Sequence, residues 1–480
     1  MEIVSLKFAI LSVVSIFIYY LLDHKYRAGF LAVLSCGFIA SFSYILLIYI
    51  IIYALVNYFV GLYLQGLKHK KALFTLGIIF NLTQLIVLRY ASFTIDPLFH
   101  LCNCNVHVAN LYRIFLPIGI SYFTLQGIGY LINLKMGWEK PEKQFIPFLL
   151  YIIFYPKFLS GPIERSNHFL PQLRSKIEFV EDNVVDGLKI AAFGLFKKAA
   201  IADQMALLIN STYANLDKAD TSTLWIVLLL QPLYLYFDFS GYTDMAIGLA
   251  KTFGIEILPN FNKPFLSQNV TTFWKRFHMS LSSWFNDYVF RQLSFKYRKW
   301  GINASVFAMF ITWTLFGIWH GAGWNFMFLG VLQAIVLTYE FFTKAWRTKM
   351  GNSVPGLLNI WSGRILTYLF YGISLVFFFS PDMSSVSVFF SSLFESGRTF
   401  SPLNPGQVLA LVMSLGFGLI FMILEIVQND FRKVDGAIMS FWNGFDRKHK
   451  FFRWVIYFLV VVIIFFSAAE GKAEFVYFRF

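Results

Sequence analysis

Long apolar runs recur along the whole chain, and short polar loops separate them. A helix needs about 20 apolar residues to cross the hydrocarbon core of a bilayer. We count roughly eleven runs that meet this need, and one or two shorter runs that we interpret as re-entrant. The pattern therefore predicts an all-α, polytopic integral membrane protein.

The loops that carry lysine and arginine predict the orientation of the spans. Basic clusters at residues 23–27 and 68–71 are separated by an even number of crossings, so both are expected in the cytoplasm. The same alternation places the loop at 96–110 outside and the segment 251–301 inside. Both chain ends are then expected outside the cytoplasm.

Two segments do not fit simple crossings. The run 145–159 is short and has basic residues on both sides, which favours a re-entrant element. In 273–290, aromatic and leucine residues recur every three or four positions, which predicts an interfacial or re-entrant helix that includes His278.

Composition agrees with a membrane protein. Of the 480 residues, 58% are hydrophobic and 14% are charged, against about 25% charged in soluble proteins. The net charge of +14 comes from basic residues in the loops, where membrane orientation and anionic headgroups explain it. The expected partner is therefore the lipid bilayer, and no nucleic acid is expected. The run 8–22 has no small-residue cleavage site after it and is interpreted as a retained span.

A single membrane domain is expected over 1–480, because no soluble domain fits between the spans. We divide it into N-terminal helices (1–135), a core (136–345) and C-terminal helices with an outer tail (346–480). Three cysteines exclude a disulfide framework. His100, Cys102, Cys104 and His107 lack the usual CxxC spacing, so no metal is predicted there.

His320 is the main candidate for chemistry. It ends the apolar run of WTLFGIWHGAGWN (313–325) and is followed by small residues. An ionisable ring is rare at membrane depth, and small neighbours let a substrate or helix approach closely. A buried histidine with one hydrogen bond to a carbonyl would fit the same pattern.

Two carboxylates, Asp238 and Asp244, lie in the run 224–249. We expect them to bond to helix termini or to pair with an arginine rather than to act chemically. Asp244 is therefore only a supporting candidate.

Three motifs carry a resemblance to a known family: FLSGPIERSNHFLPQL (158–173), FWKRFHMSLSSWFNDYVF (273–290) and GIWHGAGWNF (317–326). In this order they resemble the membrane-bound O-acyltransferase (MBOAT) family, in its bacterial branch of alginate O-acetyltransferases and the D-alanyl transfer protein. The opening, with SLKFAIL and HKYR, also resembles that branch. The resemblance implies helices around a central tunnel that is open to both faces.

The resemblance also implies roles for residues. His320 matches the family's catalytic histidine, and His278 matches a second, less strictly required one. Many relatives have Trp in place of Phe277 and Arg in place of Asn286, so the chain departs from them there. A hydroxyl that attacks a thioester must lose its proton, and an imidazole with a pKa near 6.5 suits that task.

Acetyl-CoA is the implied donor, as a co-substrate and not a permanently bound cofactor. Lys275, Arg276 and Arg298 are candidates for its phosphates, although membrane orientation alone accounts for these charges. Asn325 is a candidate oxyanion donor, and Trp319 is a supporting residue.

The last six residues, FVYFRF, resemble the F-x-Y-x-x-F ending of this branch, in which the tyrosine is thought to carry the acyl group. A phenol has one nucleophilic oxygen and forms an ester when a base lies beside it. Tyr477 is thus the candidate acyl carrier. An aromatic tail that packs on the membrane surface is the alternative.

We therefore expect an O-acetyltransferase of the bacterial inner or plasma membrane that acts on an extracytoplasmic, alginate-like polysaccharide. An outer SGNH or esterase-like acetyltransferase is the expected partner. The alternatives are a lipid or protein acyltransferase, and a transporter or flippase whose path is lined by His320, Asp238 and Asp244.

Overall fold

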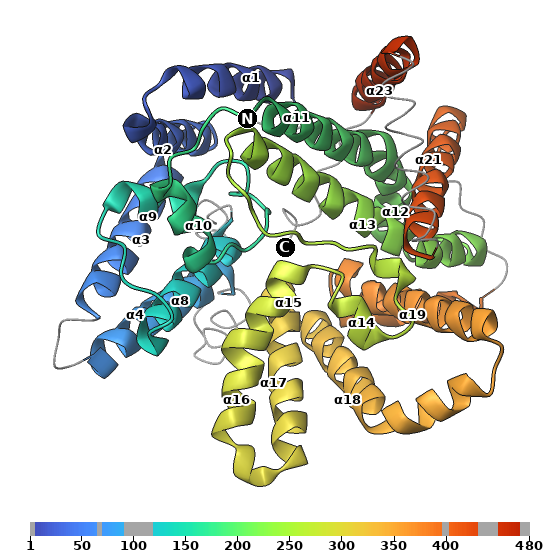
Figure 1. The fold of residues 1–480 in the computed structure, drawn as a ribbon. Coiled ribbons are helices and arrows are strands. Elements are labelled where there is room, and N and C mark those ends of the chain that lie inside the picture. The colour runs from blue at the N-terminus through green and yellow to red at the C-terminus, as the bar shows by residue number, and fades with distance from the viewer. Residues whose placement is uncertain (1–4, 65–69, 91–118, 396–402, 431–449, 471–480) are drawn as a thin grey trace, which may run out of the picture.

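The computed structural model describes residues 5–64, 70–90, 119–395, 403–430 and 450–470. These residues form helices and no named strand. In the described part, seven helices are long and apolar enough to cross a membrane, and two further apolar helices are shorter. The all-α membrane fold is confirmed, while the number of about eleven spans stays a prediction. Figure 1 shows the helices arranged around a central region.

The N-terminal helices lie on one side of the molecule, as the blue ribbons in Figure 1 show. Ser43 begins one of them, since its side chain accepts a hydrogen bond from the backbone NH of Leu46 at 3.3 Å. This cap ends the turn at residues 41–43. The helices are α1 (Leu6–Leu21), α2 (His24–Ala40), α3 (Tyr44–Tyr63), α4 (Lys70–Arg89) and α8 (Ile120–Met136).

The run predicted to be re-entrant contains only the nine-residue helix α9 (Phe145–Ile153). A buried, non-helical segment at 154–165 follows it and leads into α10 (Ser166–Arg174). Irregular backbone at membrane depth is tolerated where protein buries it. The short length and the irregular end are those expected of a re-entrant element.

Two long helical segments pack against each other in the middle of the sequence. The apolar run 188–209 is divided among α11 (Glu181–Phe196), a π-helical turn η1 (Lys197–Ala202) and α12 (Asp203–Ala214). Helix α13 (Thr221–Thr252) packs against these elements. Glycines allow this close packing: a Cβ at Gly194 would lie 2.4 Å from the Gly241 carbonyl oxygen.

In the described part of the chain, the ion pairs of the two α13 carboxylates are formed with lysines. Lys197 Nζ lies 2.7 Å from Asp244 Oδ2, and Lys198 Nζ lies 2.5 Å from Asp238 Oδ1. Lys198 also contacts Asp203 at 2.6 Å. The structural role expected of these carboxylates is therefore found, with a different cation as the partner.

The prediction of one continuous helix through His278 is wrong. The chain forms η2 (Pro264–Leu266), α14 (Val270–Trp274), α15 (Met279–Phe285), η3 (Asn286–Phe290), α16 (Arg291–Lys296) and η4 (Arg298–Trp300). Between α14 and α15 the backbone bonds to an adjacent loop: Asn262 N donates to Arg276 O, and Met279 N donates to Asn260 O, both at 2.9 Å. These bonds replace the helical ones, so His278 precedes α15 instead of lying inside it.

The remaining helices are α17 (Ile302–His320), α18 (Trp324–Asn352), α19 (Gly356–Phe379), α20 (Met383–Ser392), α21 (Pro405–Asp430) and α23 (Lys450–Glu470). Two glycines set the crossing of α17 and α18. A Cβ at Gly317 would lie 2.2 Å from Phe326 O, and one at Gly330 would lie 2.2 Å from Trp313 O. This contact fixes the last turn of α17, which ends at His320.

Candidate active site

His320 and His278 face each other across one small cavity. His320 is only 6% exposed, His278 is fully buried, and their ring centroids are 6.4 Å apart. The cavity has a volume of ≈ 20 Å³, which is enough for roughly one or two water-sized groups. Its other lining residues are mostly apolar: Leu235, Trp274, Phe277, Phe316, Leu329, Gly330, Gln333, Tyr371, Leu375 and Phe378.

The end of α4 holds the end of α17 at His320. Arg89 Nη2 donates to the His320 carbonyl oxygen at 3.0 Å, and the Tyr90 hydroxyl donates to the Ile318 carbonyl oxygen at 2.9 Å. A cation at a helix C-terminus interacts favourably with the helix dipole. These residues, which the sequence motifs do not mark, position the backbone that carries His320.

His278 is held in an unusual backbone conformation. Its φ is +47°, in the left-handed region, where non-glycine residues are uncommon. Ser280 Oγ donates to Asn260 Oδ1 at 2.6 Å, next to the backbone bond from Met279 to Asn260. Strain of this kind persists where the surroundings enforce it, and it is frequent at functional sites.

Aromatic rings enclose both imidazoles. Trp319 lies edge-on to His320, with centroids 4.9 Å apart, and 5.9 Å from His278. Its indole NH donates to Ser121 O at 3.4 Å, so α8 helps to hold it. Phe239 covers the other side of His278 at 4.6 Å. Trp319 therefore contacts both rings, as a supporting residue would.

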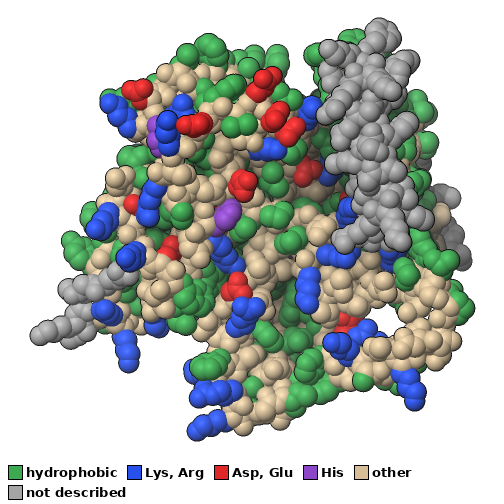
Figure 2. Space-filling view, viewed as in Figure 1, with side chains coloured by type: hydrophobic (Ala, Val, Ile, Leu, Met, Phe, Trp, Pro, Cys, Tyr) green, Lys and Arg blue, Asp and Glu red, His purple; other side chains and the backbone are tan. Residues whose placement is uncertain are grey.

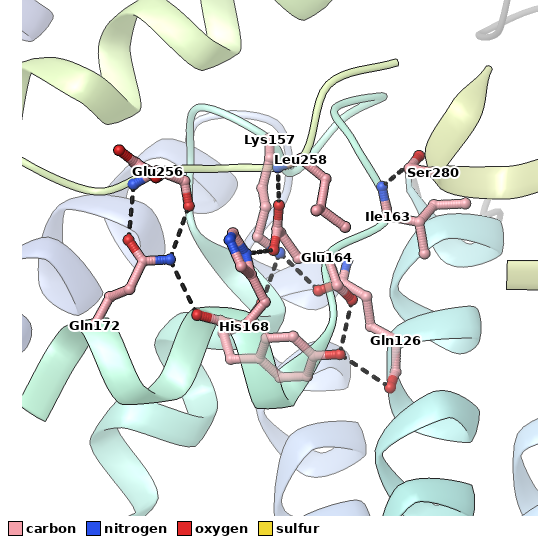
Figure 3. Close-up of polar contacts among 10 residues, drawn as sticks. Gln126, Lys157, Ile163, Glu164, His168, Gln172, Glu256, Leu258 and Ser280 are labelled. Carbon is pink, nitrogen blue, oxygen red and sulfur yellow. Dashed lines mark hydrogen bonds and ion pairs between the residues drawn. The ribbon is translucent and has the colours of Figure 1, made fainter. Parts of the chain in front are cut away.

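The SGPIER motif forms a buried polar cluster beside this site (Figure 3). Glu164 is fully buried; it accepts a hydrogen bond from Leu258 N and lies 2.9 Å from His168 Nδ1. Lys157 Nζ donates to Gln126 Oε1 and to Tyr151 O, both at 2.6 Å.

One bond connects this cluster to the second histidine: Ile163 N donates to Ser280 Oγ at 3.0 Å. Ser280 in turn bonds to Asn260, which holds the turn at His278. Two of the three sequence motifs therefore meet directly, and the third supplies His320 across the cavity. Asn260 and Ser280 were missed by sequence reasoning because their contacts are long-range.

The His168–Glu164 pair predicts a pH-dependent stability. The hydrogen bond to Glu164 raises the pKa of His168 above its usual value, against partial burial, and the charges of Glu164 and Glu256 add to the shift. The pair stabilises the fold fully below the usual pKa, about 6.5, and loses this effect as the pH rises through the raised pKa. His168→Asn should therefore lower the thermal midpoint in detergent more at pH 6 than at pH 8.5.

The matched control is His24→Asn, the same change at a histidine of α2. An equal loss for His168→Asn at both pH values would contradict the assignment.

A much larger cavity of ≈ 1480 Å³ lies between α14–α17 and α18–α19. We call it the basic funnel, because Lys275, Arg291, Lys344 and Arg347 line it. The lower part of the face in Figure 2 is hollowed, with lysine and arginine side chains around the hollow. Its lining carboxylate, Glu340, accepts bonds from the backbone NH groups of residues 270 and 271 at 2.7 and 2.8 Å.

Only one of the three residues predicted to contact phosphate lies at the basic funnel. Lys275 lines the basic funnel, but Arg276 and Arg298 are not among its lining residues. Arg298 instead donates to Phe295 O at 3.3 Å. Arg291, Lys344 and Arg347 also line the funnel, although the sequence marked all three only as indicators of orientation.

Asn325 has a different position from the one that an oxyanion donor needs. Its amide nitrogen donates to Phe377 O at 3.0 Å and to Ser380 O at 2.8 Å, so both amide hydrogens are used. It ties the start of α18 to the end of α19 and does not line the small cavity.

Some candidates lie outside the described residues: Tyr477, and the group at His100, Cys102, Cys104 and His107. Within the described ranges, no group of three or more His, Cys, Asp or Glu side chains is placed to hold a metal ion.

The family model of membrane-bound O-acyltransferases matches residues 140–381. That stretch is half of the chain and contains the basic funnel, His278 and His320. The chain is a member of the MBOAT family. It is therefore a multi-pass membrane enzyme that transfers acyl groups to oxygen.

Similar proteins agree with this membership. The chain is 31% identical to a probable alginate O-acetylase of Pseudomonas aeruginosa, over 82% of this chain and 75% of the relative. It is 31% identical to a peptidoglycan O-acetyltransferase of Helicobacter pylori, over 68% and 66%. It is 34% identical to a teichoic acid D-alanyltransferase of Bacillus subtilis, over 48% and 60%. These relatives are named for acyl transfer to alginate, peptidoglycan and teichoic acid.

Proposed function

We propose that this acyltransferase moves acetyl from cytoplasmic acetyl-CoA to a hydroxyl outside the membrane, for O-acetylation of an alginate-like or other envelope polysaccharide. The observation that carries the proposal is the pairing of a wide basic funnel with a small apolar cavity that holds His320.

The basic funnel suits coenzyme A. Its volume accommodates a long, polar molecule, and its four cationic side chains attract phosphate groups. The charge alternation places segments 251–301 and 344–349 in the cytoplasm, where acetyl-CoA is made.

The small cavity favours acetyl over an amino-acyl group. No acidic side chain is among the described residues that line it. The ammonium group of a D-alanyl thioester would therefore be buried without a counter-charge, which costs several kcal/mol. An acetyl group is neutral and has no such requirement.

In the proposed mechanism His320 is the general base. Its imidazole removes the acceptor proton as the hydroxyl oxygen forms a bond to the thioester carbonyl carbon. When the tetrahedral intermediate collapses, the carbon–sulfur bond breaks, and the imidazolium returns the proton to the thiolate of coenzyme A. His278, across the cavity, is placed to hold the thioester carbonyl.

Tyr477 is the proposed first acceptor, and an outer SGNH or esterase-like acetyltransferase is the proposed partner that passes the acetyl group to the polysaccharide. The FVYFRF ending supports this step, because a phenol oxygen can carry an acyl ester. With the bacterial relatives, the charge pattern supports a bacterial inner or plasma membrane with both chain ends outside.

We predict that Tyr477→Phe keeps acetyl-CoA binding but abolishes polysaccharide acetylation, because the variant lacks the oxygen that carries the group. The measurement is the acetyl content of polysaccharide from cells that express either form at equal level. Tyr457→Phe, a change of the same size in α23, is the control. Full acetylation with Tyr477→Phe would remove the carrier role.

Membrane vesicles from the producing cells test the function itself. With labelled acetyl-CoA outside inverted vesicles, we expect release of free coenzyme A and label in the polysaccharide fraction. Label in lipid or protein would favour those acceptors. Transport without coenzyme A release would favour a transporter, although the pairing of Asp238 and Asp244 with lysines gives that alternative little support.

A further inference from the structure

The basic funnel and the small cavity are separated by two aromatic side chains. Among the residues that the structure describes, Trp274 and Phe316 line both spaces. Their rings meet edge to face, with centroids 5.0 Å apart and planes at 76°. An acyl group that moves directly from the funnel into the small cavity therefore passes this pair.

The two rings are held differently. Phe316 lies one turn before His320 on α17, and the centroids of the two rings are 5.0 Å apart. Phe316 therefore packs directly against the His320 ring. Trp274 is at the end of α14, and a polar contact fixes its indole: Nε1 donates to Gln333 Oε1 at 3.0 Å.

That contact continues into the helices behind it. Gln333 is buried on α18 and donates from Nε2 to Ser374 Oγ at 2.9 Å, and Ser374 donates to Phe370 O at 2.8 Å on α19. Buried polar groups joined in this way hold a side chain in one orientation. The indole is therefore fixed across the passage.

We propose that Trp274, held by Gln333, is the residue that limits the acyl group to two carbons. This inference rests on the proposed acetyl transfer and extends it to acyl-length selection. In the cavity of ≈ 20 Å³ there is room for a methyl group and a carbonyl oxygen. A longer chain needs the space that the indole fills.

The size of the effect follows from the packing. One methylene too many in a closed apolar pocket costs about 10-fold or more in kcat/KM. Removal of the indole joins the small cavity to the funnel, so this penalty should disappear for four-carbon chains. Phe277 and Tyr371 pack beside Trp274, with centroids 6.0 and 6.2 Å away, and remain as walls.

The experiment compares acetyl-, propionyl- and butyryl-CoA in membrane vesicles that hold the full chain and its own acceptor. Coenzyme A release gives the ratio of butyryl to acetyl transfer. For Trp274→Ala we expect this ratio to rise by about 10-fold or more over the wild type. Gln333→Leu removes the hydrogen bond but keeps the volume, and should raise the ratio by a smaller factor.

Trp346→Ala is the matched control, because Trp346 lines the basic funnel but not the small cavity. Its butyryl-to-acetyl ratio should equal that of the wild type, whatever its rate. Thermal unfolding in detergent identifies variants that do not fold, and if Trp274→Ala is among them, Gln333→Leu decides.

A folded Trp274→Ala or Gln333→Leu protein that uses acetyl-CoA with the wild-type ratio would overturn the length limit and leave the proposed function intact. Failure of the wild type to release coenzyme A from acetyl-CoA would overturn both.

Discussion

His320→Ala should reduce coenzyme A release from acetyl-CoA by about 10²–10⁴-fold, the contribution of a positioned general base. The imidazole lines the same cavity as His278, and in the described part of the chain no carboxylate lines that cavity to replace it. The variant should still bind acetyl-CoA, since the basic funnel is unchanged. Rates are measured in native vesicles at equal protein content, and binding is measured by ligand-dependent thermal stabilisation in detergent.

His24→Ala is the matched control, because His24 begins α2 and does not line either cavity. His278→Ala should reduce the rate by a smaller factor, since its proposed role is to hold the carbonyl and not to take the proton. A His320→Ala protein that keeps a wild-type rate would assign the base to another group, and His320 would then have the structural role that its sequence pattern also fits.

The spans were predictable because a bilayer imposes strong demands on single segments. The length of an apolar run indicates a crossing. A serine such as Ser43 indicates the start of a helix through a local hydrogen bond, which does not depend on distant segments. The divided span at 181–214 was not predictable. Its π-helical turn contains the buried lysines that meet carboxylates of α13, and this contact depends on a distant segment.

The sequence predicted His320 and His278 as site residues, and their catalytic roles stay predictions, but it did not predict the geometry around them. The structure brings the two side chains to one cavity. The aromatic periodicity of 273–290 predicted a helix through His278, yet Asn260, a residue from outside that stretch, provides bonds that end it there. Local periodicity cannot reveal a competing partner of this kind.

The basic funnel shows a different limit. A lysine or arginine in a cytoplasmic loop gives the same sequence signal whether it orients a span or lines a binding site. Lys344 and Arg347 line the funnel, while Arg298 does not. The three-dimensional arrangement alone separates these cases, as it also shows that Arg89 caps the helix that carries His320.

The second large effect is expected at the buried ion pairs of Lys198. This lysine is 5% exposed and contacts Asp203 and Asp238, which are 4% and 0% exposed. Lys198→Met should destabilise the protein by about 3–5 kcal/mol, because two carboxylates then remain buried without their cation. Thermal and denaturant unfolding in detergent measure this loss.

The triple variant Lys198→Met, Asp203→Asn, Asp238→Asn tests the cause of the loss, because replacing a whole buried ion group by neutral residues is often close to neutral in stability. It should recover most of the stability that Lys198→Met loses. Lys176→Met is the control, since Lys176 and Glu178 form an exposed pair that contributes little. A triple variant that is less stable than Lys198→Met would contradict this explanation. It would mean that the ion pairs themselves stabilise the fold, because the contacts of α11, α12 and α13 already offset the cost of removing these charges from water.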